Sequence, residues 1–135
     1  MASQIFINLA VVDLEKTTKL YTAMGFTINP QFSDDTAKCL VWSDQIFLMV
    51  MTQEKFKTFA SKPLADTKGG LAAIYALSFD DLQQVNSTAD AALRAGASEP
   101  VPMKDYGFMQ LRTIEDFDGH TWELFYMDFS KMPQG

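Results

Sequence analysis

Cysteine, histidine, basic residues and long apolar runs are all scarce in this sequence, and each scarcity narrows the range of functions. Cys39 is the one cysteine, so no internal disulfide can form, and we expect a reducing, cytoplasmic environment. The net charge of −6 argues against nucleic-acid partners, because proteins that bind them need a basic face. The longest apolar run, Ile46–Met51, is far shorter than the ~18 residues of a membrane span, so we expect no membrane partner.

Familiar catalytic motifs are also missing. The sequence has no phosphate-binding loop, no Ser-His-Asp set and no Cys-x-x-Cys motif. His120 is the one histidine, and because it follows Gly119 in an expected turn we interpret it as a solvated residue on the face opposite to Glu123. Cys39 has no histidine near it in sequence, so we interpret it as a small core residue rather than a nucleophile.

What the sequence does contain is an internal repeat. Residues 5–14 read Ile-Phe-Ile-Asn-Leu-Ala-Val-Val-Asp-Leu, and residues 73–82 read Ala-Ile-Tyr-Ala-Leu-Ser-Phe-Asp-Asp-Leu. Identical residues recur 68 positions apart, namely Leu9 and Leu77, Asp13 and Asp81, and Leu14 and Leu82. A duplicated unit predicts a pseudo-symmetric interior, in which equivalent positions converge on one site.

Both halves predict the same order of elements, β-α-β-β-β. Hydrophobic periodicity, capping residues and turn residues place the boundaries. In the first half we expect strands at Ile5–Ala10, Phe26–Asn29, Ala37–Trp42 and Ile46–Met51, a helix from Asp13 to Gly25, and a short helix at Gln53–Ala60. In the second half we expect strands at Leu71–Phe79, Ser98–Met103, Phe108–Ile114 and Thr121–Met127, and a helix capped by Asp80 or Asp81.

The expected organisation is one α+β domain over residues 1–135. Module one covers residues 4–52 and module two covers residues 71–128. The segment 53–70, which holds Pro63 and the Gly69-Gly70 pair, is the predicted linker.

Two motifs resemble those of the vicinal oxygen chelate superfamily, which includes glyoxalases, extradiol dioxygenases and bleomycin resistance proteins. They are Asp-x-Asp-Gly-His-x-Trp-Glu at 116–123 and Val-x-Asp-Leu-x-Lys-x-Thr-x-x-Tyr at 11–21. The resemblance covers roughly Ile5 to Met127. It implies a glyoxalase-like fold, in which each β-α-β-β-β module forms half of a curved open barrel. It also implies a homodimer that holds its ligand on the concave face.

The resemblance further implies where a metal ion would be bound. Its four ligands would come from the first and last strand of each module, at Phe6, Leu48, Ile74 and Glu123. Three of these side chains have no donor atom, whereas a divalent ion needs several oxygen or nitrogen donors. We therefore expect no metal and no other cofactor.

Strand alternation around Glu123 predicts the remaining site residues. Glu123 is the candidate catalytic or anchoring group of a largely apolar pocket. The candidate ligand-binding residues are Phe6, Asn8, Leu48, Ile74, Ser78, Tyr106, Arg112 and Phe125. Alternatives to these ligand-binding roles remain open. Tyr106 could anchor its own loop, and Arg112 could lie at the surface or at a dimer interface. The bulky side chains could also fill the pocket, so that no cavity exists.

Three classes of function remain open. The first is a metal-free protein that binds an unidentified small organic molecule, similar to bleomycin resistance proteins. The second is an enzyme, a lyase or dioxygenase relative, which uses Glu123 as acid–base or has an atypical metal shell. The third is a structural dimer module with a vestigial pocket.

Overall fold

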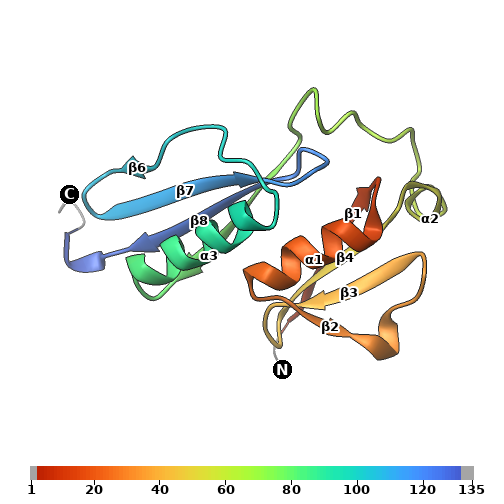
Figure 1. Cartoon of the computed structure of the whole chain (residues 1–135), viewed down its shortest axis with the longest axis horizontal. Helices are drawn as coiled ribbons and strands as arrows, with labels where there is room; N and C mark the ends of the chain where they lie inside the picture. Colours follow the sequence, from red (N-terminus) through yellow and green to blue (C-terminus); the bar gives the residue numbers. More distant parts are fainter. Residues whose placement is uncertain (1–2, 132–135) are drawn as a thin grey trace. The chain divides into compact units, whose positions relative to one another are not determined.

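The computed structural model describes residues 3–131, and the chain divides into two compact units between Asp66 and Thr67. Each unit contains a four-stranded mixed sheet with a helix packed on one face (Figure 1). The β-α-β-β-β order occurs in both units, so the α+β class and the duplicated architecture predicted from the sequence are confirmed. Among the described residues, no helix has both the length and the apolar character to cross a membrane.

The first unit has strand order β1-β4-β3-β2. Its elements are β1 (Ile5–Val11), α1 (Leu14–Met24), β2 (Thr27–Asn29), a short 3₁₀ helix (Pro30–Phe32), β3 (Ala37–Val41), β4 (Ile46–Thr52) and α2 (Gln53–Lys57). Strands β1 and β4 are parallel, and the other pairs are antiparallel.

The second unit repeats this arrangement with strand order β5-β8-β7-β6. Its elements are β5 (Ile74–Phe79), α3 (Leu82–Arg94), β6 (Lys104–Asp105), β7 (Met109–Glu115), β8 (Thr121–Met127) and a short 3₁₀ helix (Phe129–Lys131). Strands β5 and β8 are parallel, and β8, β7 and β6 are antiparallel.

The repeated aspartates begin the two long helices. The Asp13 carboxylate accepts a hydrogen bond from the Lys16 N–H at 3.0 Å, and the Asp81 carboxylate accepts one from the Gln84 N–H at 2.8 Å. Each satisfies a backbone donor that has no partner within the helix. Asp81 is therefore the cap of α3, rather than Asp80.

Each helix buries the core of its own unit against one face of its sheet. In the first unit Leu20 and Tyr21 of α1 are fully buried, and in the second unit Val85 of α3 is fully buried. From β8, Trp122 and Leu124 point into this second core and are 2% and 0% exposed. The opposite face of each sheet is not covered by that helix, and we refer to it as the open face.

The strand expected at Ser98–Met103 is wrong. Ser98 makes only an isolated bridge to Glu115, and regular pairing with β7 begins at β6. Pro100 and Pro102 lie in the intervening segment, where they remove two backbone donors that a ladder would need. The strand expected at Leu71–Phe79 is shorter, since β5 begins at Ile74.

A tight turn joins β7 to β8. The Asp116 carboxylate accepts hydrogen bonds from the N–H groups of Asp118 and His120, both at 2.9 Å. His120 is 8% exposed, so its interpretation as a solvated residue is wrong. At the start of the unit, the Thr67 hydroxyl donates to the Asp118 carbonyl, which holds residues from Thr67 onward against this turn.

Substitution of Gly119 by alanine should destabilise the second unit. Gly119 has φ +87°, and a Cβ there would lie 2.1 Å from the Thr67 carbonyl oxygen. Gly107 is the matched control, because it has φ +84° but open space around it. We expect Gly107→Ala to cost about 1 kcal/mol from the backbone alone, and Gly119→Ala at least about 2 kcal/mol. Urea unfolding of both variants measures the difference, and equal losses would contradict the close packing of Thr67.

Candidate functional site

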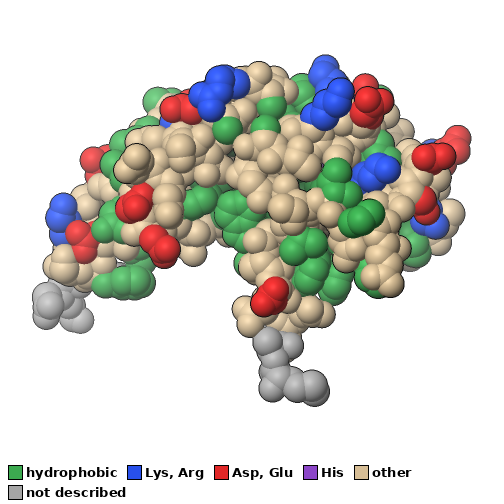
Figure 2. All heavy atoms as spheres, turned by 60° about the horizontal axis from the view of Figure 1, so that its bottom comes forward, with side chains coloured by type: hydrophobic (Ala, Val, Ile, Leu, Met, Phe, Trp, Pro, Cys, Tyr) green, Lys and Arg blue, Asp and Glu red, His purple; other side chains and the backbone are tan. Residues whose placement is uncertain are grey.

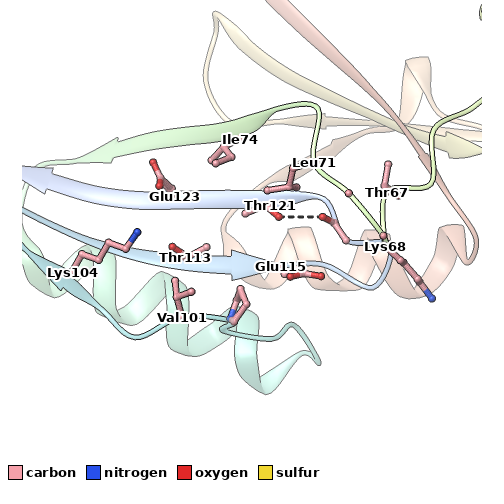
Figure 3. A pocket seen from close by; sticks show the side chains of 14 residues that line it. Thr67, Lys68, Leu71, Ile74, Val101, Lys104, Thr113, Glu115, Thr121 and Glu123 are labelled. Carbon is pink, nitrogen blue, oxygen red and sulfur yellow. Dashed lines mark hydrogen bonds between the residues drawn. The ribbon is translucent and has the colours of Figure 1, made fainter.

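The open face of the second unit carries a hollow of about 430 Å³ that contains Glu123 (Figure 3). Glu123 lies opposite Ala76 of β5 and Thr113 of β7, and Thr121 lies opposite Ile74 and Glu115. The complete lining is Thr67, Lys68, Gly69, Gly70, Leu71, Ile74, Pro100, Val101, Lys104, Thr113, Glu115, Gly119, Thr121 and Glu123.

The Glu123 carboxylate is half-buried and has no internal partner among residues 3–131. No hydrogen bond or ion pair joins it to another described side chain. Its neighbours Thr113 and Thr121 are buried, and the Thr121 hydroxyl donates to the Gly119 carbonyl at 3.1 Å. The carboxylate is therefore free to meet a molecule that enters the hollow.

The hollow in the second unit carries both signs of charge. Lys68 and Lys104 line it together with Glu115 and Glu123. Figure 3 shows Lys104 on the strand beyond Thr113, so the lysine and Glu123 come from different strands of one sheet. This mixture suits a small polar ligand better than a purely apolar one.

In the first unit, the predicted position of Leu48 on the open face is wrong. Leu48 is 1% exposed and belongs to the core under α1. The register of β4 is the reason, because Phe6 lies opposite Phe47 and Asn8 lies opposite Met49. Asn8 is the equivalent of Ala76, which lies opposite Glu123, so the first-unit equivalent of Glu123 is Met49.

The corrected positions do not fit a divalent metal ion. Phe6, Met49 and Ile74 offer at most one soft thioether, and Glu123 offers the one carboxylate. Among residues 3–131, no group of three His, Cys, Asp or Glu side chains is arranged to hold a metal. Borderline and hard divalent ions require several nitrogen or oxygen donors, and these four positions do not supply them.

The predicted ligand-binding role of Arg112 is also wrong. Arg112 lies opposite Leu124 and so points to the helix side of the sheet. Its guanidinium donates to both carboxylate oxygens of Glu99, at 2.9 and 3.0 Å, and to Asp90 at 2.9 Å. These bonds raise the pKa of Arg112 and fix it as a structural link between β7, α3 and the segment after it.

The remaining predicted residues lie outside the Glu123 hollow, except for Ile74. Ser78 is exposed opposite the half-buried Phe125, farther along the same open face. Tyr106 is 54% exposed in the turn after β6, where its N–H donates to the Met109 carbonyl at 2.8 Å. Tyr106 does not line the hollow.

Two other ionisable groups are held in their neutral forms. Burial raises the pKa of the Cys39 thiol, and the residue is buried as expected, but it lies opposite Met49 on the open-face side of the first sheet. Burial, and secondarily the charge of Asp116, raises the pKa of Tyr75. The Tyr75 ring lies 5.1 Å from the Trp122 ring, on the helix side of the sheet. Neither Cys39 nor Tyr75 lines the Glu123 hollow, so neither is placed to act as a nucleophile there.

Sequence reasoning missed several residues of the two open faces. They are Lys104, Thr113 and Glu115 in the second unit, the segment 67–71 of that unit, and Phe47 and Met49 in the first unit. Alternation within β7 separates Thr113 and Glu115 from Arg112, but it does not say which set faces the helix. The segment 67–71 has no periodic signal at all, since it is a loop.

Comparison with known proteins gives the same fold. A model of the Glyoxalase/Bleomycin resistance protein/Dioxygenase superfamily matches residues 4–124. No curated protein matches the chain.

Solved structures with this fold come from several bacteria. A hypothetical protein from S. aureus is 20% identical, with a TM-score of 0.77 over 93% of this chain and 94% of that chain. A family enzyme from Burkholderia phytofirmans PsJN is 14% identical, with a TM-score of 0.74 over 93% and 99%. A genomically encoded fosfomycin resistance protein from Listeria monocytogenes is 17% identical, with a TM-score of 0.69 over 97% and 98%. At these identities the likeness concerns the fold alone. The family match, which spans nearly the whole chain, carries the assignment: this protein belongs to the glyoxalase/bleomycin resistance protein/dioxygenase superfamily.

Proposed function

We propose that this chain is a metal-free protein that binds a small organic molecule, with Glu123 as the polar anchor. The observation that carries the proposal is the Glu123 carboxylate, which faces a hollow and has no partner among the described side chains. A volume of about 430 Å³ lies within the range typical of ligand pockets.

An unpartnered, half-buried carboxylate favours a ligand that brings a donor. Removing a carboxylate from water is costly unless a hydrogen bond or an opposite charge replaces the water. A ligand with a cationic or N–H group would supply this at Glu123, and Thr113 and Thr121 would limit its orientation. Phe6, Met49, Ile74 and Glu123 occupy the strand positions that hold the metal ligands in metal-binding relatives. Only Glu123 offers a carboxylate there, since Phe6, Met49 and Ile74 replace three donors.

An enzymatic function is the second candidate, and Lys104 is the observation that favours it. Lys104 and Glu123 line the same hollow, so it contains both a carboxylate that can accept a proton and an ammonium that can stabilise a negative charge. In this version Glu123 removes a proton from the bound molecule. Binding at Glu123 is common to both candidates.

Substitution of Glu123 by glutamine should weaken ligand binding without loss of stability. The change keeps the shape and removes the charge, so we expect affinity to fall at least about tenfold, as for the loss of a charge-assisted hydrogen bond. The free energy of unfolding should change by less than about 0.5 kcal/mol, since no described side chain depends on the carboxylate. Native mass spectrometry for co-purified molecules, followed by calorimetry with each molecule found, measures both.

Glu115→Gln is the matched control for this experiment. It removes the same charge from the same hollow, two rungs of the sheet away from the Glu123 position. Equal losses from both variants would mean that the hollow needs only net negative charge, and would contradict an anchor at Glu123. A chain that carries and binds no small molecule would favour the structural-module hypothesis.

Metal analysis should return far less than one equivalent per chain. The expectation follows from the donor set at Phe6, Met49, Ile74 and Glu123, which provides a single carboxylate. Purification without chelator, then elemental analysis of Mn, Fe, Co, Ni and Zn, makes the measurement. A stoichiometric ion that is lost in Glu123→Gln would refute the metal-free proposal.

We expect a homodimer in solution. In its own sheet each of β1 and β5 is an edge strand, and Ile5 and Ile74 on these strands are 54% and 51% exposed. Edge strands with apolar side chains favour pairing with another chain. Light scattering at micromolar concentration should give twice the 15.1 kDa of one chain. A monomer mass that does not change with concentration would contradict the dimer.

A further inference from the structure

A second hollow lies on the open face of the first unit, and its chemistry differs from that of the Glu123 hollow. Its volume is about 610 Å³. The lining consists of Gln4, Phe6, Asn8, Asn29, Phe32, Cys39, Phe47 and Met49. None of these side chains is charged at neutral pH. Figure 2 shows that hydrophobic side chains reach the surface on the face in view, and Phe6 and Phe32 are among the exposed aromatic residues.

An aromatic platform forms one side of this hollow. The rings of Phe6 and Phe47 are stacked, with centroids 4.4 Å apart and planes inclined by 8°. Phe6 is nevertheless 49% exposed, so Phe47 covers only part of its ring and the rest remains open. A third planar ring, from a ligand, can extend this stack, and ring stacking gains energy beyond the burial of area. Phe6 occupies a position that the family resemblance assigns to a metal ligand, and here it presents a ring.

Three carboxamides provide the polar points, and each has used only part of its capacity. The amide NH₂ groups of Gln4 and Asn8 donate to the carbonyls of Asp44 and Phe6, at 3.0 and 3.3 Å. The Asn29 oxygen accepts from the Gln31 N–H at 3.0 Å. Acceptors of Gln4 and Asn8 and the donor of Asn29 are therefore available to a ligand. A molecule with an N–H donor and a carbonyl acceptor on its edge matches this set.

Electrical neutrality of the lining decides the charge of the ligand. A charged group placed in this hollow would lose water without gaining a counter-ion, which is unfavourable. We infer that the first-unit hollow binds a flat, uncharged heteroaromatic molecule, stacked on Phe6 and hydrogen-bonded through the carboxamides. This site is separate from the Glu123 hollow, so the inference goes beyond the proposed function and names the chemical class of a second ligand.

The probe for this inference is 2-quinolone, a planar neutral lactam with one N–H and one carbonyl group. The readout is NMR of a protein labelled with ¹³C at the methionine methyl groups. Met49 lines the hollow, whereas Met24 is 4% exposed in the core of the same unit. We expect the Met49 methyl resonance to shift by ring current and to saturate at about millimolar probe, as is typical of a fragment. The Met24 resonance should stay in place.

Matched ligands and variants separate stacking from mere hydrophobicity. The ring-saturated lactam octahydro-2-quinolone and the anion quinoline-2-carboxylate should each bind at least about tenfold more weakly than 2-quinolone. Phe6→Leu and Phe47→Leu should each weaken 2-quinolone by about three- to tenfold. Phe129→Leu is the control, because Phe129 is 75% exposed in the second unit, and it should leave the affinity unchanged.

The outcomes distinguish this inference from the proposed function. Glu123→Gln should leave the 2-quinolone titration of Met49 unchanged. A negative result for ligand binding at Glu123 can therefore be told apart from a negative result for 2-quinolone binding in the first-unit hollow. The inference is overturned if 2-quinolone leaves the Met49 methyl unmoved, or if Phe6→Leu and Phe47→Leu bind it as the wild type does. A Met49 resonance that moves with protein concentration and not with probe would assign the hollow to a second copy of the chain, and would also overturn it.

Discussion

The register of two parallel strand pairs is the constraint on which the rest of the structure depends. In the first unit β1 pairs with β4 so that Asn8 lies opposite Met49, and in the second unit β5 pairs with β8 so that Ala76 lies opposite Glu123. A shift of one residue in either pair would exchange the helix face for the open face. The cores under α1 and α3 fix the register, because Leu48 and Leu124 are buried there. Packing energy thus determines which side chains are left to meet a ligand.

The two units share one backbone arrangement but differ in the side chains of their open faces. The open face of the first unit presents phenylalanine rings and carboxamides, and that of the second unit presents lysines, glutamates and threonines. Duplication explains the common strand order, while the cores tolerate little change because they are close-packed. The open faces have no such restriction, so substitutions there cost less stability. This explains why the repeat is visible at Leu9 and Leu77 yet absent at Met49 and Glu123.

Most of the fold was readable from the sequence, since periodicity and capping residues are local signals. The helix start at Asp13 and the strand at Thr121–Met127 were predicted in place, and the cap of the second helix was narrowed to Asp80 or Asp81. The errors arose where the information is not local. Ile46–Thr52 is apolar on both faces, so alternation alone does not orient Leu48 against Met49. Arg112 was assigned to the pocket because its partners, Glu99 and Asp90, lie on elements whose placement needs the tertiary structure.

The contact between Thr67 and the β7–β8 turn has a consequence for the order of assembly. The Thr67 hydroxyl bonds to the carbonyl of Asp118, which lies 51 positions later in the chain. Contacts over such separations form slowly, since the closure entropy of the intervening loop opposes them. During synthesis the segment 67–71 leaves the ribosome long before the turn that holds it. The bond needs the β7–β8 turn, so the wall of the Glu123 hollow cannot be completed before that turn has formed.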